Sequence, residues 1–239
     1  MHALHCFLTL TLLLATASCS SVDRVRRVDA SLLSGLPATA MVEIDAARAQ
    51  LNFAEDTLAE REKAATVAAK EAEVARARLD VDRSELAQAK LEEQLAEQTG
   101  SPLAVASARR ERALKLFEMG VRRAELSVAE RISDLKDAEA VVARATMRTR
   151  RAEVELYKAQ AVSELDLAEA QAVAVADFQK DVFGHEKSLA SAEGKLARSN
   201  EGLLEAKIRL NEAQQKLDAQ RQQNASEEAA EAAAAAVSN

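Results

Sequence analysis

The sequence predicts an all-α protein, a long antiparallel coiled-coil hairpin plus a third helical segment. Among 239 residues, aromatic side chains make up 3%, Gly and Pro number 6 and 2, and charged residues reach 30%. This composition is typical of long helices, and it lacks the bulky side chains that fill a wide globular core. Apolar residues that recur every seven positions, on both sides of a compact turn signal, complete the prediction.

Residues 1–18 have the features of a signal peptide. Residues 3–17 form an apolar run of about 15 residues, shorter than the ~20 that a membrane-spanning helix needs. The run ends in small residues and is followed by Cys19. We expect cleavage before Cys19, which removes Cys6. A plain secretory cut after Ala17 and retention of the segment are the alternatives.

The sequence Ala-Thr-Ala-Ser-Cys at residues 15–19 resembles the lipobox of bacterial lipoproteins. The resemblance implies that Cys19 is acylated and becomes the mature N-terminus. Several fatty acyl chains, such as palmitate, hold a protein on a membrane stably. Ser20 stands where an Asp retains a lipoprotein in the inner membrane. The resemblance therefore implies the periplasmic side of the outer membrane, with a secreted or soluble periplasmic form as the alternative.

Residues 19–40 are expected to form a linker after the lipidated cysteine. Gly35 and Pro37 lie near its end, and both disfavour helix. Its basic side chains are expected to be solvated, with contact to anionic lipid headgroups as the alternative. They are Arg24, Arg26 and Arg27.

Residues 41–160 are predicted to form the hairpin. In its first helix one apolar row runs every seven residues from Ile44 to Leu86, and a second follows three residues later from Ala47 to Ala89. Two rows with this spacing over seven heptads are a strong coiled-coil signal.

Residues 99–102 predict a tight turn between two helices. Gly100 suits the left-handed position just beyond a helix end, Ser101 suits an N-cap, and Pro102 suits the first position of the next helix. If the turn is centred between Ser101 and Pro102, two residues that face each other across the two helices have residue numbers that sum to 203.

This register makes nearly every layer of the seam pair a large side chain with an alanine, as in Leu79 with Ala124. Such pairing fills a seam without voids. Acidic residues before the turn also face arginines after it, which favours the antiparallel register. The charged seam residues Arg131 and Asp82 are expected to extend sideways into water.

Residues 161–224 are predicted to form a further helix with a bend near Gly184. An apolar row runs every seven residues from Val182 to Leu217. The pattern leaves open whether this helix folds back or continues outward. Residues 225–239 are expected to be a low-complexity tail, either a fraying helix or disordered.

The residue types argue against an enzyme. After residue 18 the chain contains one histidine, His185, expected at a helix end, and one cysteine, Cys19, so neither a catalytic triad nor a His–Cys metal site can be assembled. No Gly-rich phosphate loop occurs. We therefore expect no cofactor and no small-molecule substrate. The net charge of -7 argues against nucleic-acid binding. Basic clusters at 107–112 and 147–151 are expected to pair with acids on neighbouring helices.

The alanine- and glutamate-rich helices after Cys19 resemble those of bacterial envelope lipoproteins, and residues 41–160 resemble the hairpins of periplasmic adaptors of efflux and secretion systems. The expected function is that of a non-enzymatic, lipid-anchored periplasmic coiled coil, a structural tether, spacer or assembly scaffold of the cell envelope. An accessory or adaptor subunit of an envelope transport, secretion or motility machine is the alternative. A secreted lipid-binding protein is a third possibility. We expect a protein partner, or self-association through helix faces.

Overall fold

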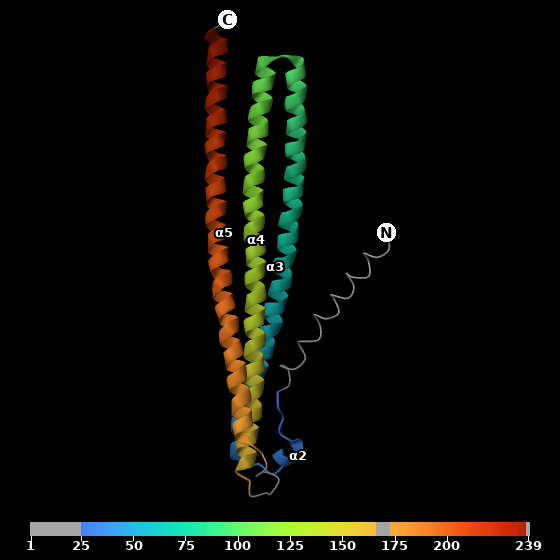
Figure 1. Ribbon diagram of the computed structural model, residues 1–239, viewed down its shortest axis with the longest axis vertical. Coiled ribbons are helices and arrows are strands. Elements are labelled where there is room, and N and C mark those ends of the chain that lie inside the picture. Colours follow the sequence, from blue (N-terminus) through green and yellow to red (C-terminus); the bar gives the residue numbers. More distant parts are fainter. Residues whose placement is uncertain (1–24, 166–172, 238–239) are drawn as a thin grey trace, which may run out of the picture. The chain divides into compact units, whose positions relative to one another are not determined.

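The computed structural model describes residues 25–165 and 173–237 (Figure 1). These residues are all-α and contain no strand. The helices are α2 (Ala30–Leu33), α3 (Ala38–Thr99), α4 (Pro102–Ser163) and α5 (Val175–Val237). The predicted fold class, a long helical hairpin followed by a third helix, is confirmed. The predicted signal peptide and Cys19 lie outside the described residues.

The chain divides into two compact units. Unit 1 contains Met1–Glu55 and Ala145–Leu189, and unit 2 contains Asp56–Arg144 and Ala190–Asn239. Each unit therefore holds one stretch of α3, one of α4 and one of α5. The three helices have 62, 62 and 63 residues, so each measures about 93 Å at 1.5 Å per residue.

The two predicted apolar rows of α3 form its buried seam. Every buried apolar residue described in α3 belongs to the row that starts at Ile44 or the row that starts at Ala47. In unit 1 they are Ile44, Ala47 and Ala54, and in unit 2 they are Ala65, Ala68, Ala72, Leu79, Leu86 and Ala89. Small residues at most of these positions let the helices approach closely, and burial of Leu79 and Leu86 contributes about 1.5–3 kcal/mol each.

Ion pairs across the hairpin report its register. The numbers of the paired residues sum to between 200 and 206, as for Arg61 with Glu139 and Arg76 with Glu130. The predicted sum of 203 lies within this range. The register inferred from the turn residues is therefore confirmed in both units.

Helix α4 buries more than the seam that its heptads predict. Apolar residues outside the predicted rows are also buried, because α5 packs on a second face of α4. They are Ala140 and Ala143 in unit 2, and Val154 and Val162 in unit 1. Helix α5 contributes Phe178 in unit 1 and Ala192, Ala206 and Leu217 in unit 2.

Helix α5 runs antiparallel to α4, which answers the question that the sequence left open. In unit 2, Gly202 lies 3.7 Å from the side chain of Arg131 (measured from an ideal Cβ position), and Arg221 reaches Glu118 at 3.4 Å. Higher numbers on α5 thus face lower numbers on α4, and the third helix folds back (Figure 1).

The bend expected near Gly184 does not interrupt the helix. Helix α5 continues through Gly184, and the interruption lies between Ser163 and Val175. One interior glycine costs a helix about 1 kcal/mol, which the packed row of α5 offsets. His185 consequently lies inside a helix and not at its end. Helix α5 also extends through the expected tail as far as Val237, since alanine has the highest helix propensity.

Residues 25–37 form specific contacts within unit 1, although Arg26 and Arg27 remain exposed. Arg26 forms an ion pair with Asp177, and its guanidinium carbon lies 5.8 Å from the centre of the Phe178 ring. The backbone N–H of Val28 donates to the buried Glu155 carboxylate at 2.9 Å. The short helix α2 follows, capped by Asp29. These contacts attach the N-terminal segment to α4 and α5.

Candidate functional site

The predicted turn residues Gly100, Ser101 and Pro102 lie where the sequence placed them. Gly100 has φ of 71°, the left-handed conformation that glycine adopts without strain. The Ser101 carbonyl accepts from Val105 N–H at 3.0 Å, and its Oγ accepts a longer bond from Ala104 N–H at 3.4 Å. Pro102 opens α4. The connection between α3, which ends at Thr99, and α4, which begins at Pro102, is therefore short.

The first basic cluster, residues 107–112, pairs with acidic side chains as expected. Arg112 contacts Glu93 at 2.7 Å, and Arg109 contacts Glu97 at 2.9 Å and Glu93 at 3.3 Å. The hydrogen bond from Arg112 lowers the pKa of Glu93 below its ordinary value. These pairs neutralise the arginines, so the cluster is not a free anion-binding surface.

The third arginine of this cluster, Arg110, pairs with the distant end of α5. Both terminal nitrogens of Arg110 donate to Glu231, at 2.5 and 2.9 Å, and only 13% of the arginine side chain is exposed. The hydrogen bond from Arg110 lowers the pKa of Glu231, and the same bond raises the pKa of Arg110. A bidentate pair of this kind also defines the orientation of the two side chains.

A polar groove of ≈ 540 Å³ surrounds the Arg110–Glu231 pair. Gln220 lies seven residues after Ala213, and Asn224 lies seven residues after Leu217. These two polar residues continue the apolar rows of α5, so the α4–α5 seam changes from apolar to polar here. Helix α4 contributes Ala106, Arg109, Arg110 and Ala113, and α5 contributes Gln220, Asn224, Glu227, Ala230 and Glu231. Because Arg109 and Arg110 are already paired, the groove offers neither of these cations free to a ligand.

Three exposed leucines lie near the turn in unit 2. Leu91, Leu95 and Leu103 are 60%, 60% and 65% exposed. All three lie outside the buried seam and outside the apolar heptad rows predicted from the sequence. Exposed apolar residues beside paired charges are a feature of protein-binding surfaces.

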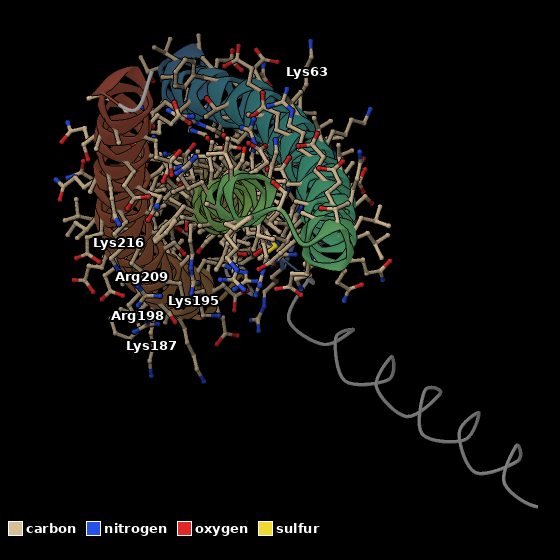
Figure 2. All side chains as sticks on the ribbon, turned by 90° about the horizontal axis from the view of Figure 1, so that it is seen from above. Lys63, Lys187, Lys195, Arg198, Arg209 and Lys216 are labelled. Carbon is tan, nitrogen blue, oxygen red and sulfur yellow. The ribbon has the colours of Figure 1, made fainter. Side chains whose placement is uncertain are left out.

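The outer face of α5 in unit 2 carries both signs of charge. Figure 2 shows Lys195, Arg198, Arg209 and Lys216 pointing outward from this helix. Exposed Glu201, Glu205 and Glu212 alternate with them. A face of mixed charge suits a protein partner better than a polyanion.

The second basic cluster, residues 147–151, is also paired. Arg150 contacts Glu153 at 2.7 Å, and Arg151 contacts Glu55 at 3.0 Å. Arg151 thus pairs with an acid on a neighbouring helix as expected, whereas Arg150 pairs within its own helix α4.

The two charged seam residues behave differently. Arg131 is 53% exposed and pairs with Asp134 at 3.3 Å, so it extends sideways as expected. Asp82 does not extend into water: its side chain is 19% exposed and pairs with Arg122 at 3.2 Å, because α4 brings that arginine over the seam.

The described residues contain no group of three or more His, Cys, Asp or Glu side chains placed to hold a metal ion. None of the helices in residues 25–165 and 173–237 combines the length and the apolar character that a membrane crossing requires.

Comparison of the chain with protein-family models, with curated proteins and with solved structures finds no match.

Proposed function

We propose that the protein is a non-enzymatic, lipid-anchored coiled coil of the bacterial cell envelope, where it serves as a structural tether, spacer or assembly scaffold. One observation carries the proposal: the side chains of the described residues are used to hold long helices together. The buried apolar residues lie in helix–helix seams, and charged residues of both basic clusters pair with nearby helices.

The anchor rests on the lipobox-like sequence that ends at Cys19. Val25, the first described residue, follows Cys19 by only six positions. Arg26 and Val28 then bind α4 and α5 within unit 1. A lipid on Cys19 would therefore hold Val25 within about 20 Å of a membrane surface, given at most ~3.3–3.6 Å per residue of an extended chain.

Mass spectrometry of the mature N-terminus, isolated from membranes, tests this proposal. The expected species begins at Cys19 and carries two or three acyl chains. A chain that begins at Ser18 without modification would refute the anchor. A Cys19→Ser variant is the matched control, and it is expected to leave the membrane fraction while its helix content stays unchanged.

A second candidate function is that of an accessory or adaptor subunit, and the exposed leucines near the turn favour it. A photo-crosslinking amino acid at Leu95 is expected to capture one stoichiometric envelope protein if the turn docks on a machine. The same probe at Val141, an exposed site on α4, is the control. Equal products from both sites would argue for the spacer alone.

A further inference from the structure

Helix α3 has a third row of residues, which its packing against α4 does not use. In unit 2 this row includes Val67, Val74 and Val81, which are 49%, 51% and 57% exposed. Seven residues make nearly two helical turns, so the three valines lie on one face of α3. Exposed Glu60 and Gln88 bound the row at the same spacing. The apolar part of the row therefore extends over two heptad steps, with a polar residue at each end.

The middle of this row lies in a groove of ≈ 530 Å³. Val67 and Val74 of α3 line it, together with Ala129 of α4. Glu71 and Arg78 also line the groove, and neither has an ion-pair partner within the part of the chain that the structure describes. They are seven residues apart on one helix, about 10.5 Å, so they cannot pair with each other.

The order of residues along this face is self-complementary. From residue 60 to residue 88 the row reads Glu, Val, Val, Val, Gln, which is symmetric in polarity about Val74. The unpaired charges beside Val74 are opposite in sign, with Glu71 on one side and Arg78 on the other. A surface that binds its own copy about a two-fold axis requires opposite charges at the two symmetric positions.

An antiparallel second copy satisfies both features at once. A two-fold axis beside Val74 places Val67 next to Val81 of the second copy and Glu71 next to Arg78 of the second copy. Two ion pairs then form, and all three valine positions lose exposed surface. In a parallel arrangement the flank that carries Glu71 and Arg78 faces the opposite flank of the second copy's valine row, so Glu71 and Arg78 do not meet.

We propose that this α3 face, consisting of Val67, Val74 and Val81 with Glu71 and Arg78, binds a second copy of the chain in antiparallel orientation. A lipid surface fits it less well, because lipid-adsorbing helices carry a broader apolar face. The inference goes beyond the proposed function, since the face forms the same contact whether or not Cys19 carries lipid.

Sedimentation equilibrium of the full chain in density-matched detergent tests the association. The expected result is a dimer whose dissociation constant rises at least tenfold in Val74→Glu. Val141→Glu, at an exposed valine of α4, is the control and is expected to leave the constant unchanged. A wild-type monomer at every concentration, or an equal effect of both substitutions, would overturn the proposal.

Charge reversal tests the ion pairs separately from the apolar contacts. Glu71→Arg and Arg78→Glu are each expected to weaken dimerisation several-fold, because each places like charges together. The double variant exchanges the two charges and is expected to return to within about threefold of the wild-type constant. A double variant as weak as the product of the two single effects would contradict the pairing. Circular dichroism confirms that each variant keeps its helix content.

Disulfide formation tests the orientation. With Cys6 and Cys19 replaced by Ser, the remaining chain contains no cysteine. Val67→Cys and Val81→Cys chains are then mixed and oxidised. The antiparallel arrangement predicts that, for chains mixed in equal amounts, the dimer between positions 67 and 81 exceeds either homodimer by well over the twofold ratio of random pairing. A dominant dimer between two copies of position 67 would show a parallel contact and exclude the proposed axis.

Discussion

Single charged residues in this protein act mainly through pairs that join segments far apart in the chain. Arg26 and Asp177 join the N-terminal segment to α5 in unit 1, and Arg110 and Glu231 join α4 to the end of α5 in unit 2. Exposed ion pairs contribute little stability each, about 0–1 kcal/mol. Their main effect is to select which helices meet and in which register.

The Arg110–Glu231 pair predicts a pH dependence. Because the folded chain lowers the pKa of Glu231 below the ordinary value of 4.5, the pair stabilises the end of α5 at higher pH. This contribution is lost as pH falls below 4.5 and through the folded pKa. Hydrogen exchange of the peptide backbone around Glu231, corrected for the intrinsic rate, is expected to accelerate over that range.

Glu231→Gln is the informative variant for this measurement, because glutamine does not titrate. It is expected to remove most of the pH dependence and to raise exchange at neutral pH. Glu212→Gln, at an exposed position of α5 that lies 19 residues before Glu231, is the control and is expected to keep the wild-type profile. Identical profiles for wild type and Glu231→Gln would show that the pair does not order the end of α5.

At the scale of elements, glycine has opposite roles in the turn and within the helices. Gly100 has a positive φ that the turn requires, whereas Gly120 lies within α4. An added Cβ would meet no atom within 4 Å at either position. Space is therefore equal at the two sites, and the backbone conformation alone distinguishes them.

This difference predicts opposite effects of one substitution. Gly100→Ala is expected to lower the free energy of unfolding by about 1–2 kcal/mol, the cost of a left-handed L-residue. Gly120→Ala is expected to raise it by about 0.5–1 kcal/mol, since alanine restricts the unfolded chain and favours helix. Urea denaturation followed by circular dichroism measures both. A loss of stability in both variants would contradict the straight, open environment of Gly120.

At the scale of the whole molecule, the return of α5 along α4 distinguishes this protein from a simple two-helix hairpin. Helix α4 has partners on two sides, and its buried residues therefore extend beyond one heptad seam. Helix α3 buries one seam among the described residues, and a separate face of the same helix carries the exposed valine row. This asymmetry between α3 and α4 is the physical basis for the proposed self-association.

Two phenylalanines of α5 test whether the helix packs in this way. Phe178 is 5% exposed and Phe183 is 69% exposed. Phe178→Ala is expected to lower the free energy of unfolding by about 3–5 kcal/mol, whereas Phe183→Ala changes it by less than about 0.5 kcal/mol. The shift of the urea midpoint measures each. Equal effects would show that α5 does not bury the Phe178 face.

Local signals in the sequence were sufficient for the hairpin. The rows that begin at Ile44 and Ala47 specify which face of α3 is buried, because a helix repeats its faces every seven residues. Gly100, Ser101 and Pro102 specify the turn through backbone preferences that act within a few residues. Once the turn is placed, the register follows from the equal rise per residue of the two helices.

The direction of α5 and the attachment of residues 25–37 depended on the tertiary structure. Both rest on contacts between distant residues, such as Arg110 with Glu231, and many other acidic residues would pair with Arg110 at similar energy. Gly184 illustrates the same limit. Glycine lowers the local helix propensity at this position, but the packing of α5 on α4 supplies the missing stability and the helix continues. Periodicity thus identified the apolar face of α5, whereas only long-range packing decided which helix that face covers.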